Sequence, residues 1–325
     1  MSKPYLQRDS NPFPNSDTNK RYYTYDYYNR ITFGGKCAKI VLDAGFTCPN
    51  IDGKCGTGGC IYCSVRGSYG LRDVPEASIR AQFDKAVRIM TQKWSTDKFI
   101  AYFQAHTNTY APVSVLREKF EPVLSYPGVV GVSVATRADC LDPDIVEYLD
   151  DLAGRIPLTV ELGLQTSCDK TARFINRGHT YEQFIDGYKR LRAAKNKINI
   201  CIHIIFGLPG ETDEMMLDTV RAVADLKPDI VKIHLLHIIK GTVMDKLYSE
   251  GRYVPLERGH YVRLVCDALE LLPPDTVIER LTGDGLSDEL VAPLWSMKKL
   301  CVINDIDKML YERQTYQGIR YEAQK

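Results

Sequence analysis

Three cysteines near the start of the chain have a spacing that suits metal ligation. Cys48 lies in the segment DAGFTCPN at residues 43–50, eleven residues separate it from Cys60, and two more separate Cys60 from Cys63. Three such thiolates can hold an iron–sulfur cluster while one iron keeps no protein ligand. Because an open iron can bind a substrate or a cofactor directly, the spacing points to chemistry more than to architecture.

A fourth thiol in the same loop means that the spacing fits more than one kind of metal site. Cys55, taken with Cys60 and Cys63, matches the spacing of plant-type ferredoxins. Four thiols between residues 48 and 63 could equally close a tetrahedral zinc site, and free thiols are the third possibility. The spacing alone does not decide between an iron–sulfur cluster, zinc and free thiols.

Length, composition and charge limit the class of protein. The chain has 325 residues, ten cysteines and a formal net charge of +1. This length suits one α/β barrel or two smaller domains, and ten cysteines are too few for a disulfide scaffold of this size. Their clustering in one glycine-rich loop favours metal ligation in a reducing compartment. No stretch resembles a secretion signal or a membrane span, so we expect a soluble cytoplasmic protein without membrane contact.

Apolar runs alternate with helical patterns along the chain. The stretches 79–94 and 181–191 repeat their apolar residues with the helical period, and short apolar runs between such stretches favour parallel βαβ units. Strands buried on both faces are nearly continuously apolar, as are the runs at 38–44, 99–105, 129–136, 158–164, 198–206 and 230–238. The polar residues that follow these runs are therefore expected at one end of a sheet.

This alternation predicts an α/β fold, a partial (βα)6 TIM-like barrel over residues 37–240. We expect an α/β extension over residues 241–325 to cover the open side of the barrel. Within that extension, 277–285 has the pattern of another strand and turn, and 294–312 that of a helix with lysines on its outer face.

Residues 1–36 form an aromatic and basic arm. They contain six tyrosines, six basic residues and three acidic residues. Tyrosine rings beside arginines could stack unpaired bases and meet phosphates. The alternative is an aromatic arm that packs on the barrel.

Six segments stand out, namely DAGFTCPN at 43–50, GGCIYC at 58–63, YFQAHTNTY at 102–110, ELGLQT at 161–166, NRGHT at 176–180 and GLPGET at 207–212. Together they resemble the radical S-adenosylmethionine (SAM) superfamily, and within it the YhcC/YtqA-like family related to the radical domain of the elongator catalytic subunit. The resemblance implies a radical SAM barrel with the cysteine loop at its catalytic mouth. The long spacer between the first two cysteines departs from the short CxxxCxxC of most superfamily members.

The resemblance also implies the cofactors and their ligands. Cys48, Cys60 and Cys63 correspond to the ligands of a [4Fe–4S] cluster whose fourth iron chelates SAM, and Cys55 lies outside the family pattern. An electron from the reduced cluster would cleave SAM to a 5′-deoxyadenosyl radical, which removes hydrogen from an unactivated carbon. A reductase or a flavodoxin- or ferredoxin-type protein is the implied electron donor.

Contacts with SAM are expected at the ends of several strands. The turn that begins Gly207, Leu208, Pro209 passes the adenine in relatives, although a plain tight turn has the same pattern. Glu161 and Gln165 share strand parity, so both could face the barrel interior and meet the ribose or the amino group of SAM.

Three further polar residues are candidates for SAM or substrate contacts. Arg137 and Arg177 could bind the SAM carboxylate or a substrate phosphate, although single arginines are more often structural ion-pair residues. Asn108 occupies the mouth of the second strand, where relatives contact the methionine amino group.

Three histidines, His203, His234 and His237, lie within apolar runs. A hydrogen-bonded core histidine is the expected role for each.

The leading functional hypothesis is a radical SAM enzyme that acts on tRNA, on the side chain of a modified wobble uridine. This substrate follows from the resemblance to the elongator-like group. No acetyltransferase sequence accompanies the barrel, so we expect tailoring of an existing uridine substituent. The alternatives are a radical SAM enzyme for a small molecule or a protein side chain, and a non-enzymatic zinc or electron-transfer protein.

Overall fold

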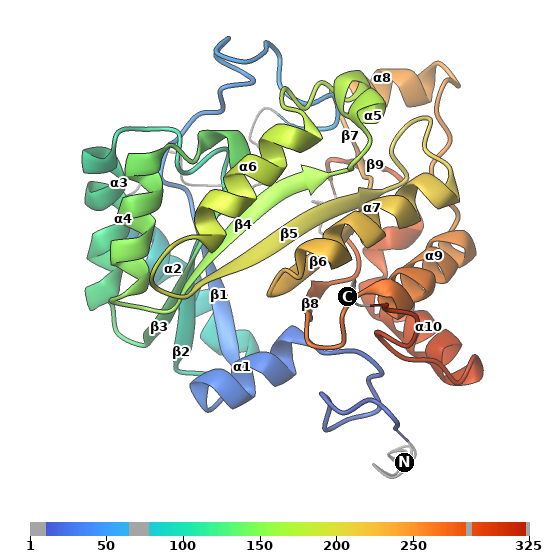
Figure 1. Ribbon diagram of the computed structural model, residues 1–325, viewed down its shortest axis with the longest axis horizontal. Coiled ribbons are helices and arrows are strands. Elements are labelled where there is room, and N and C mark those ends of the chain that lie inside the picture. The colour runs from blue at the N-terminus through green and yellow to red at the C-terminus, as the bar shows by residue number, and fades with distance from the viewer. Residues whose placement is uncertain (1–10, 65–77, 284–287, 323–325) are drawn as a thin grey trace.

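Seven parallel strands form one curled sheet in a computed structural model that describes residues 11–64, 78–283 and 288–322 (Figure 1). The strand order is β1-β2-β3-β4-β5-β6-β8, and every neighbouring pair is parallel. The strands are β1 (Cys37–Leu42), β2 (Lys98–Phe103), β3 (Val129–Thr136), β4 (Leu158–Gln165), β5 (Ile198–Phe206), β6 (Ile230–Leu235) and β8 (Val277–Arg280). This half-barrel confirms the predicted fold class.

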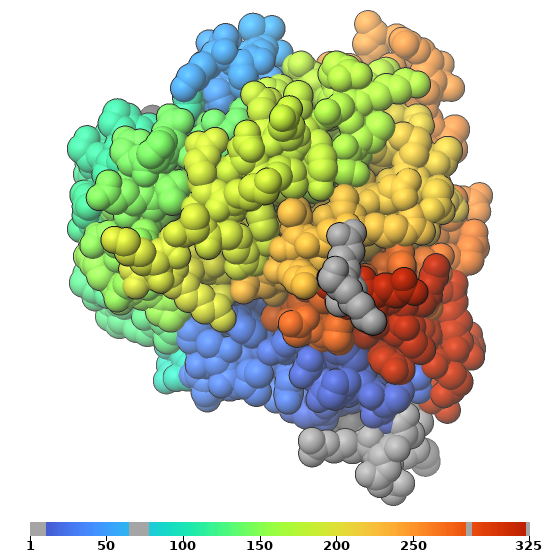
Figure 2. Space-filling model, viewed as in Figure 1, coloured from blue at the N-terminus to red at the C-terminus, as the bar shows by residue number. Residues whose placement is uncertain are grey.

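Helices cover the outer face of the sheet (Figures 1 and 2). They are α2 (Ile79–Lys93), α3 (Val113–Phe120), η2 (Glu121–Ser125), η3 (Ala138–Cys140), α4 (Pro143–Ala153), α5 (Asp169–Phe174), α6 (Tyr181–Arg192) and α7 (Asp213–Leu226). Side chains at their N-termini fix where several begin. Thr180 and Gln183 form a reciprocal capping box at α6, and Thr212 caps α7.

The two faces of the sheet differ in chemistry. On β4, Leu158, Val160, Leu162 and Leu164 are fully buried against the helices. The alternate residues point to the inner, concave face, and there Glu161 takes the middle position. The buried aliphatic side chains of β4 therefore pack the helices against the outer face of the sheet, and the inner face carries polar groups.

The C-terminal third of the chain adds β8 to the sheet and a group of helices beside α7 (Figure 1). It contains α8 (Val243–Ser249), α9 (Arg258–Leu271), η4 (Leu294–Met297) and α10 (Lys299–Glu312), with β7 (Ile238–Ile239) antiparallel to β9 (Leu290–Ala292). The division of the chain at residues 36 and 240 stays a prediction.

Two of the predicted elements need correction. The run 230–238 is not one strand. Strand β6 ends at Leu235, and the chain then forms β7, which belongs to a separate two-stranded sheet. The single helix expected over 294–312 is broken at Lys298, whose ψ of 59° is not helical. The strand expected within 277–285 is present as β8, and residues 284 and 285 lie outside the described residues.

The aromatic arm packs against the amino end of the sheet in the part that the structure describes, which excludes residues 1–10. Helix α1 (Tyr25–Phe33) follows Thr24, which caps it. The carbonyl of Tyr23 accepts a hydrogen bond from the backbone of Ile278 in β8 at 2.7 Å, and Tyr25 stacks on Tyr28. These rings serve packing, the second of the two roles considered for the arm.

No helix among the described residues is both long enough and apolar enough to cross a bilayer.

Candidate active site

The loop after β1 carries the three cysteines at the carboxyl end of the sheet, where it projects at the top of Figures 1 and 2. A turn begins at Cys48, whose carbonyl accepts a hydrogen bond from Ile51 at 2.8 Å. The chain then folds back, because the N–H of Gly59 donates to the carbonyl of Asn50 at 2.9 Å. Gly59 has a φ of 72°, which glycine adopts without a Cβ penalty. This fold returns Cys60 toward Cys48.

The thiols of Cys48, Cys60 and Cys63 act as one donor set. Burial, then Cys60 and Cys48, raises the pKa of Cys63 to about 12. Burial also raises the pKa of Cys60, and Cys48 acts in the same direction. The effect arises because ionising one thiol opposes ionising its neighbour. A bound cluster reverses this, since its iron ions favour thiolates.

Cys55 differs from the other three loop thiols in its exposure and in its contact with Arg137. It is exposed, and its Sγ accepts a hydrogen bond from Nη2 of Arg137 at 3.5 Å. Within the described part of the chain, the loop thiols are not among the groups whose ligand atoms all lie within 4.8 Å of one another. A tetrahedral zinc site would hold its sulfurs about 3.8 Å apart.

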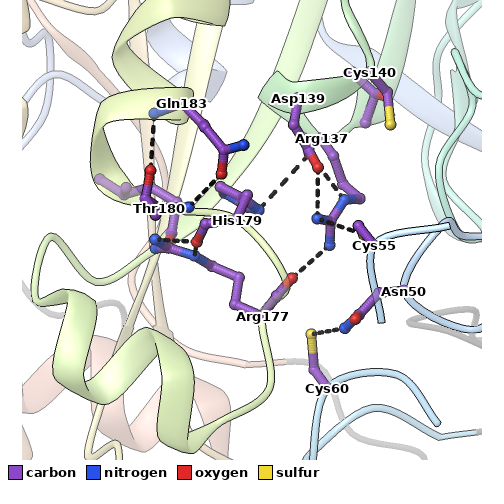
Figure 3. A network of polar contacts seen from close by, with 12 residues as sticks. Asn50, Cys55, Cys60, Arg137, Asp139, Cys140, Arg177, His179, Thr180 and Gln183 are labelled. Carbon is purple, nitrogen blue, oxygen red and sulfur yellow. Dashed lines mark hydrogen bonds and ion pairs between the residues drawn. The ribbon is translucent and has the colours of Figure 1, made fainter. Parts of the chain in front are cut away.

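Two asparagines, Asn50 and Asn176, join the cysteine loop to the segment that follows α5, and Figure 3 shows Asn50 beside Cys60. Nδ2 of Asn176 donates to the carbonyls of Thr57 and Gly59 at 3.0 and 2.7 Å. In return, Nδ2 of Asn50 donates to the carbonyl of Asn176 and lies 3.8 Å from Sγ of Cys60. The position of Cys60 is therefore fixed by side chains from two separate parts of the chain.

Arg177 is buried, and it holds the same segment to the end of β4. Its guanidinium donates to the carbonyls of Leu164 and Thr166, the latter at 2.6 Å, and twice to the carbonyl of His179 at 2.9 and 3.1 Å. Four of its five N–H groups are thus bound to backbone oxygens. The role of Arg177 in binding SAM or phosphate stays a prediction, and the structure gives it a positioning role.

Arg137 connects the end of β3 to both parts of this clasp (Figure 3). It forms a bidentate pair with Asp139 at 2.8 and 3.0 Å, and its Nη1 donates to the carbonyl of Arg177 at 2.6 Å. The remaining contact is the one with Cys55. Its charge is already paired, so a contact with the SAM carboxylate also stays a prediction.

Glu161 occupies the centre of the inner face and joins six strands. Its side chain is fully buried. Its two oxygens accept hydrogen bonds from one residue of each other barrel strand up to β6: Lys39 at 2.6 Å, Tyr102 at 2.9 Å, Ser133 at 2.5 Å, His203 at 2.8 Å, and Lys232. A carboxylate in this position links strands that the backbone ladder joins only to their neighbours.

The charges of this network balance. Glu279 of β8 pairs with Lys39 at 2.6 Å and with Lys232 at 3.0 Å, so two carboxylates face two ammonium groups. Burial alone would raise the pKa of Glu161, but Lys232 and Lys39 hold it well below its ordinary value. Burial likewise opposes the charge on Lys39, yet Glu161 and Glu279 raise its pKa. The pKa of Lys232 is raised in the same way by Glu161 and Glu279, so Glu161, Lys39 and Lys232 stay ionised at neutral pH.

The ligand atoms of Glu161, Cys201 and His203 lie within 4.8 Å of one another, as in a metal site. Lys39 and Lys232 both contact the same carboxylate. Two buried positive charges so close repel a further cation, and we assign no metal there.

Comparison with known proteins places these features in a family. Residues 52–223 match the Radical SAM superfamily, and residues 228–312 match the Radical_SAM C-terminal domain. The chain is 49% identical to YtqA of Bacillus subtilis over 95% of both proteins. The chain belongs to the radical SAM superfamily.

Two further similarities bear on the fold and on the radical SAM region. The solved structure of archaeal Elp3 from Methanocaldococcus infernus superposes with a TM-score of 0.62 over 86% of this chain and 64% of that one, at 17% identity. This likeness concerns the fold. A tRNA uridine(34) acetyltransferase of Methanocaldococcus jannaschii is 30% identical over 159 residues, which is 48% of this chain and 28% of that protein.

Radical SAM enzymes use a [4Fe–4S] cluster and SAM. The loop suits that cluster, because Cys48 and Cys60 lie near enough to Cys63 to raise its pKa, while the thiol of Cys55 is bonded by Arg137. Cys48, Cys60 and Cys63 would hold three irons and leave the fourth for SAM.

Other residues expected to contact SAM are placed around the same mouth. Asn108 is buried, and its Nδ2 donates to the carbonyls of Ala105 and Ala135 at 3.0 and 2.9 Å, so it braces β2 against β3. Gln165 has a φ of 68° at a bulge in the β4–β5 ladder. Its side-chain amide has no hydrogen-bond partner within the described ranges. Of these two side chains, that of Gln165 is the more available to bind a ligand. The SAM contacts of Asn108 and Gln165 stay predictions.

The backbone of the turn at Gly207 is already engaged. The N–H of Gly207 points at Sδ of Met216 at 3.1 Å, and its carbonyl accepts a hydrogen bond from the hydroxyl of Tyr253 at 2.6 Å. A φ of 88° requires glycine here. The adenine contact assigned to Gly207, Leu208 and Pro209 stays a prediction, and any such contact must come from the groups that follow Gly207.

The structure shows several site residues that the sequence argument missed. Lys39 and Lys232 interrupt apolar strands, and a lysine in a buried strand is itself a signal of a paired partner. Asn50 and Asn176 lie within two of the quoted motifs, at 43–50 and 176–180, but nothing in the sequence indicated that each binds the other's segment. Among the histidines, the prediction is confirmed for His203, which bonds Glu161.

We predict that Cys48→Ala, Cys60→Ala and Cys63→Ala each lose the cluster, whereas Cys55→Ala keeps it. The reason is that the first three thiols form one donor set and Cys55 bonds Arg137 instead. Iron and acid-labile sulfide per chain, measured after anaerobic reconstitution, provide the check. Loss of iron in Cys55→Ala together with retention in Cys48→Ala would reverse the assignment.

We predict that Glu161→Gln lowers the free energy of unfolding by about 3–5 kcal/mol, because it leaves two buried lysines with one carboxylate between them. Urea denaturation of the apo-protein measures the change. Glu214→Gln is the matched control, since Glu214 pairs with Arg221 at 2.6 Å on an exposed surface. The control is expected to cost less than about 1 kcal/mol, and equal losses in both variants would contradict the central role of Glu161.

Proposed function

We propose that this radical SAM enzyme modifies the substituent of the wobble uridine of tRNA. The observation that carries the proposal is the 30% identity, over 159 residues, to a protein that acts on tRNA uridine 34. The matching region is confined to 28% of that protein. The proposal therefore concerns hydrogen removal from a uridine substituent, and it does not extend to acetyl transfer.

The inner face of the half-barrel supports a polar substrate. Lys39, Tyr102, Glu161, His203 and Lys232 all present polar atoms there, and Tyr102 lies under both ammonium groups at 4.6 and 4.8 Å from its ring centroid. A nucleobase offers hydrogen-bond donors, acceptors and a flat face to such a surface.

The chain supplies positioning, and the cofactors supply the reactivity. When bound, the cluster and SAM provide the radical chemistry that removes hydrogen from an unactivated carbon. Asn50 and Asn176 hold the cysteine loop in place, and Arg177 fixes that clasp to the end of β4. A base must leave its stack to reach this interior, and Gln165 has a free amide at the mouth to meet it.

Superfamily members need a reductant, and we propose a flavodoxin- or ferredoxin-type protein or a reductase. The cysteine loop lies at the surface, with Ile51 and Phe174 exposed beside it at 40% and 53%. The loop is joined to the end of α5 by a hydrogen bond from Ile61 to the carbonyl of Ile175 at 3.0 Å. An electron donor could therefore approach the cluster without entering the substrate cavity.

We predict that deleting the gene changes the modified nucleoside found at the wobble uridine of the affected tRNAs. Mass spectrometry of nucleosides from purified tRNA measures the change. Complementation with the wild-type gene is expected to restore the profile, and complementation with Cys60→Ala is not, because that variant lacks a cluster ligand. An unchanged wobble profile in the deletion strain would overturn the tRNA assignment and favour a small molecule or a protein side chain.

A further inference from the structure

The amide of Asn50 does more than join two segments of the chain, because one of its N–H groups faces the sulfur of a cysteine expected to bind the cluster. Its Nδ2 donates to the carbonyl of Asn176 and also to Sγ of Cys60, at 3.8 Å from the sulfur (Figure 3). An amide nitrogen carries two N–H groups, so each partner takes one of them. Asn50 is fully buried, and bulk water therefore does not compete for either bond.

The chemistry of the two partners determines which end of the amide faces the sulfur. The carbonyl of Asn176 can only accept a hydrogen bond, so it must face Nδ2 of Asn50. If the amide were turned over, two oxygens would meet and the N–H groups would point away from Cys60. The observed orientation is therefore the one that satisfies both partners.

The oxygen of the same amide is held without a partner. Oδ1 of Asn50 is buried and accepts no hydrogen bond within the described residues. A Cβ on Gly56 would lie 2.1 Å from this oxygen, and a Cβ on Gly178 would lie 2.7 Å from it, so either side chain would push the amide from its place. Buried polar atoms without partners are rare, and a redox role is one reason for them. The packing thus keeps Nδ2 on the sulfur although Oδ1 stays unbonded.

A second donor acts on the same sulfur. Burial raises the pKa of the Cys60 thiol, and a hydrogen bond from the hydroxyl of Tyr62 opposes that effect. Arg137 and the amide of Asn50 act on this pKa in the same direction as Tyr62. At Cys63, by contrast, burial and the two neighbouring thiols all raise the pKa. The chain therefore stabilises negative charge on Cys60 more than on Cys63.

Hydrogen bonds to the ligand sulfurs help to set the reduction potential of an iron–sulfur cluster. Reduction adds one negative charge to the cluster and its thiolates. A donor that points at a thiolate stabilises this added charge, so the potential rises. Exposure to water acts in the same direction, because burial without donors disfavours the more highly charged form.

We propose that the amide of Asn50 and the hydroxyl of Tyr62 raise the reduction potential of the cluster through their hydrogen bonds to Cys60. Their effect is to ease the transfer of one electron from the donor protein to the cluster, and no bond forms or breaks in that step. Both residues act through the ligand and are positioning residues. The inference depends on the cluster and is independent of the tRNA substrate, so it stands or fails separately from the wobble-uridine proposal.

Redox titration of the anaerobically reconstituted enzyme, followed by the EPR signal of the reduced cluster, tests the proposal. Titanium(III) citrate serves as the reductant, and SAM is left out so that the potential of the cluster alone is measured. At a fixed potential, we expect Asn50→Ala and Tyr62→Phe each to shift the ratio of reduced to oxidised cluster about tenfold toward the oxidised form. For a one-electron couple, this shift is a fall of about 59 mV in the midpoint potential.

Asn176→Ala is the matched control. Asn176 joins the same two segments, but its amide donates to the carbonyls of Thr57 and Gly59 instead of to a sulfur. A loosened loop admits water to the cluster, so we expect the potential of Asn176→Ala to equal or exceed that of the wild type. A fall in Asn176→Ala as large as that in Asn50→Ala would show that Asn50 acts only by holding the loop, and the proposal would be wrong.

Iron and acid-labile sulfide per chain are measured for every variant, and potentials are compared between fully loaded proteins. If Asn50→Ala does not hold the cluster, Tyr62→Phe decides, because it removes one hydroxyl and keeps the ring. An unchanged potential in fully loaded Tyr62→Phe would then overturn the proposal. If Tyr62→Phe lowers the potential and fully loaded Asn50→Ala does not, the role assigned to Asn50 is wrong.

Discussion

One buried carboxylate determines the shape on which the rest of the structure depends. Glu161 accepts hydrogen bonds from β1, β2, β3, β5 and β6 while it sits on β4. A parallel sheet can twist open or curl, and its backbone ladder connects only adjacent strands. Contacts across the concave side favour the curled form. That curl brings the carboxyl ends of six strands together and places the polar network on the inner face of the sheet.

A second, separate set of hydrogen bonds holds the cysteine loop at the carboxyl end of the sheet. Asn50 and Asn176 bind each other's segments, Arg177 ties them to β4, and Arg137 ties them to β3. Asn50, Asn176 and Arg177 use their donors mainly on backbone carbonyls, and Arg137 also pairs with Asp139. Residues that sequence motifs suggest as ligand contacts can thus act by positioning. Here the three thiols converge because the backbone around them is fixed by hydrogen bonds from distant segments.

Much of this architecture could be predicted from the sequence, and the missing parts have physical reasons. The strands at 129–136 and 198–206 were predicted with the observed bounds because their apolar residues bury the outer face. The ligand set of Cys48, Cys60 and Cys63 is implied by the resemblance and stays a prediction. The Glu161 network could not be predicted, since its partners come from residues 39 to 232 and only the curl of the sheet brings them together. The break at Lys298 and the split after Leu235 depend on tertiary packing, which local periodicity does not report.

Formation of 5′-deoxyadenosine tests most directly whether the three-cysteine site performs radical SAM chemistry. The anaerobically reconstituted protein, given dithionite and SAM, is expected to produce 5′-deoxyadenosine, and the Cys60→Ala variant is not. A protein with a fully loaded [4Fe–4S] cluster that forms none under these conditions would contradict the account. So would oxygen-free preparations in which the loop thiols bind only zinc.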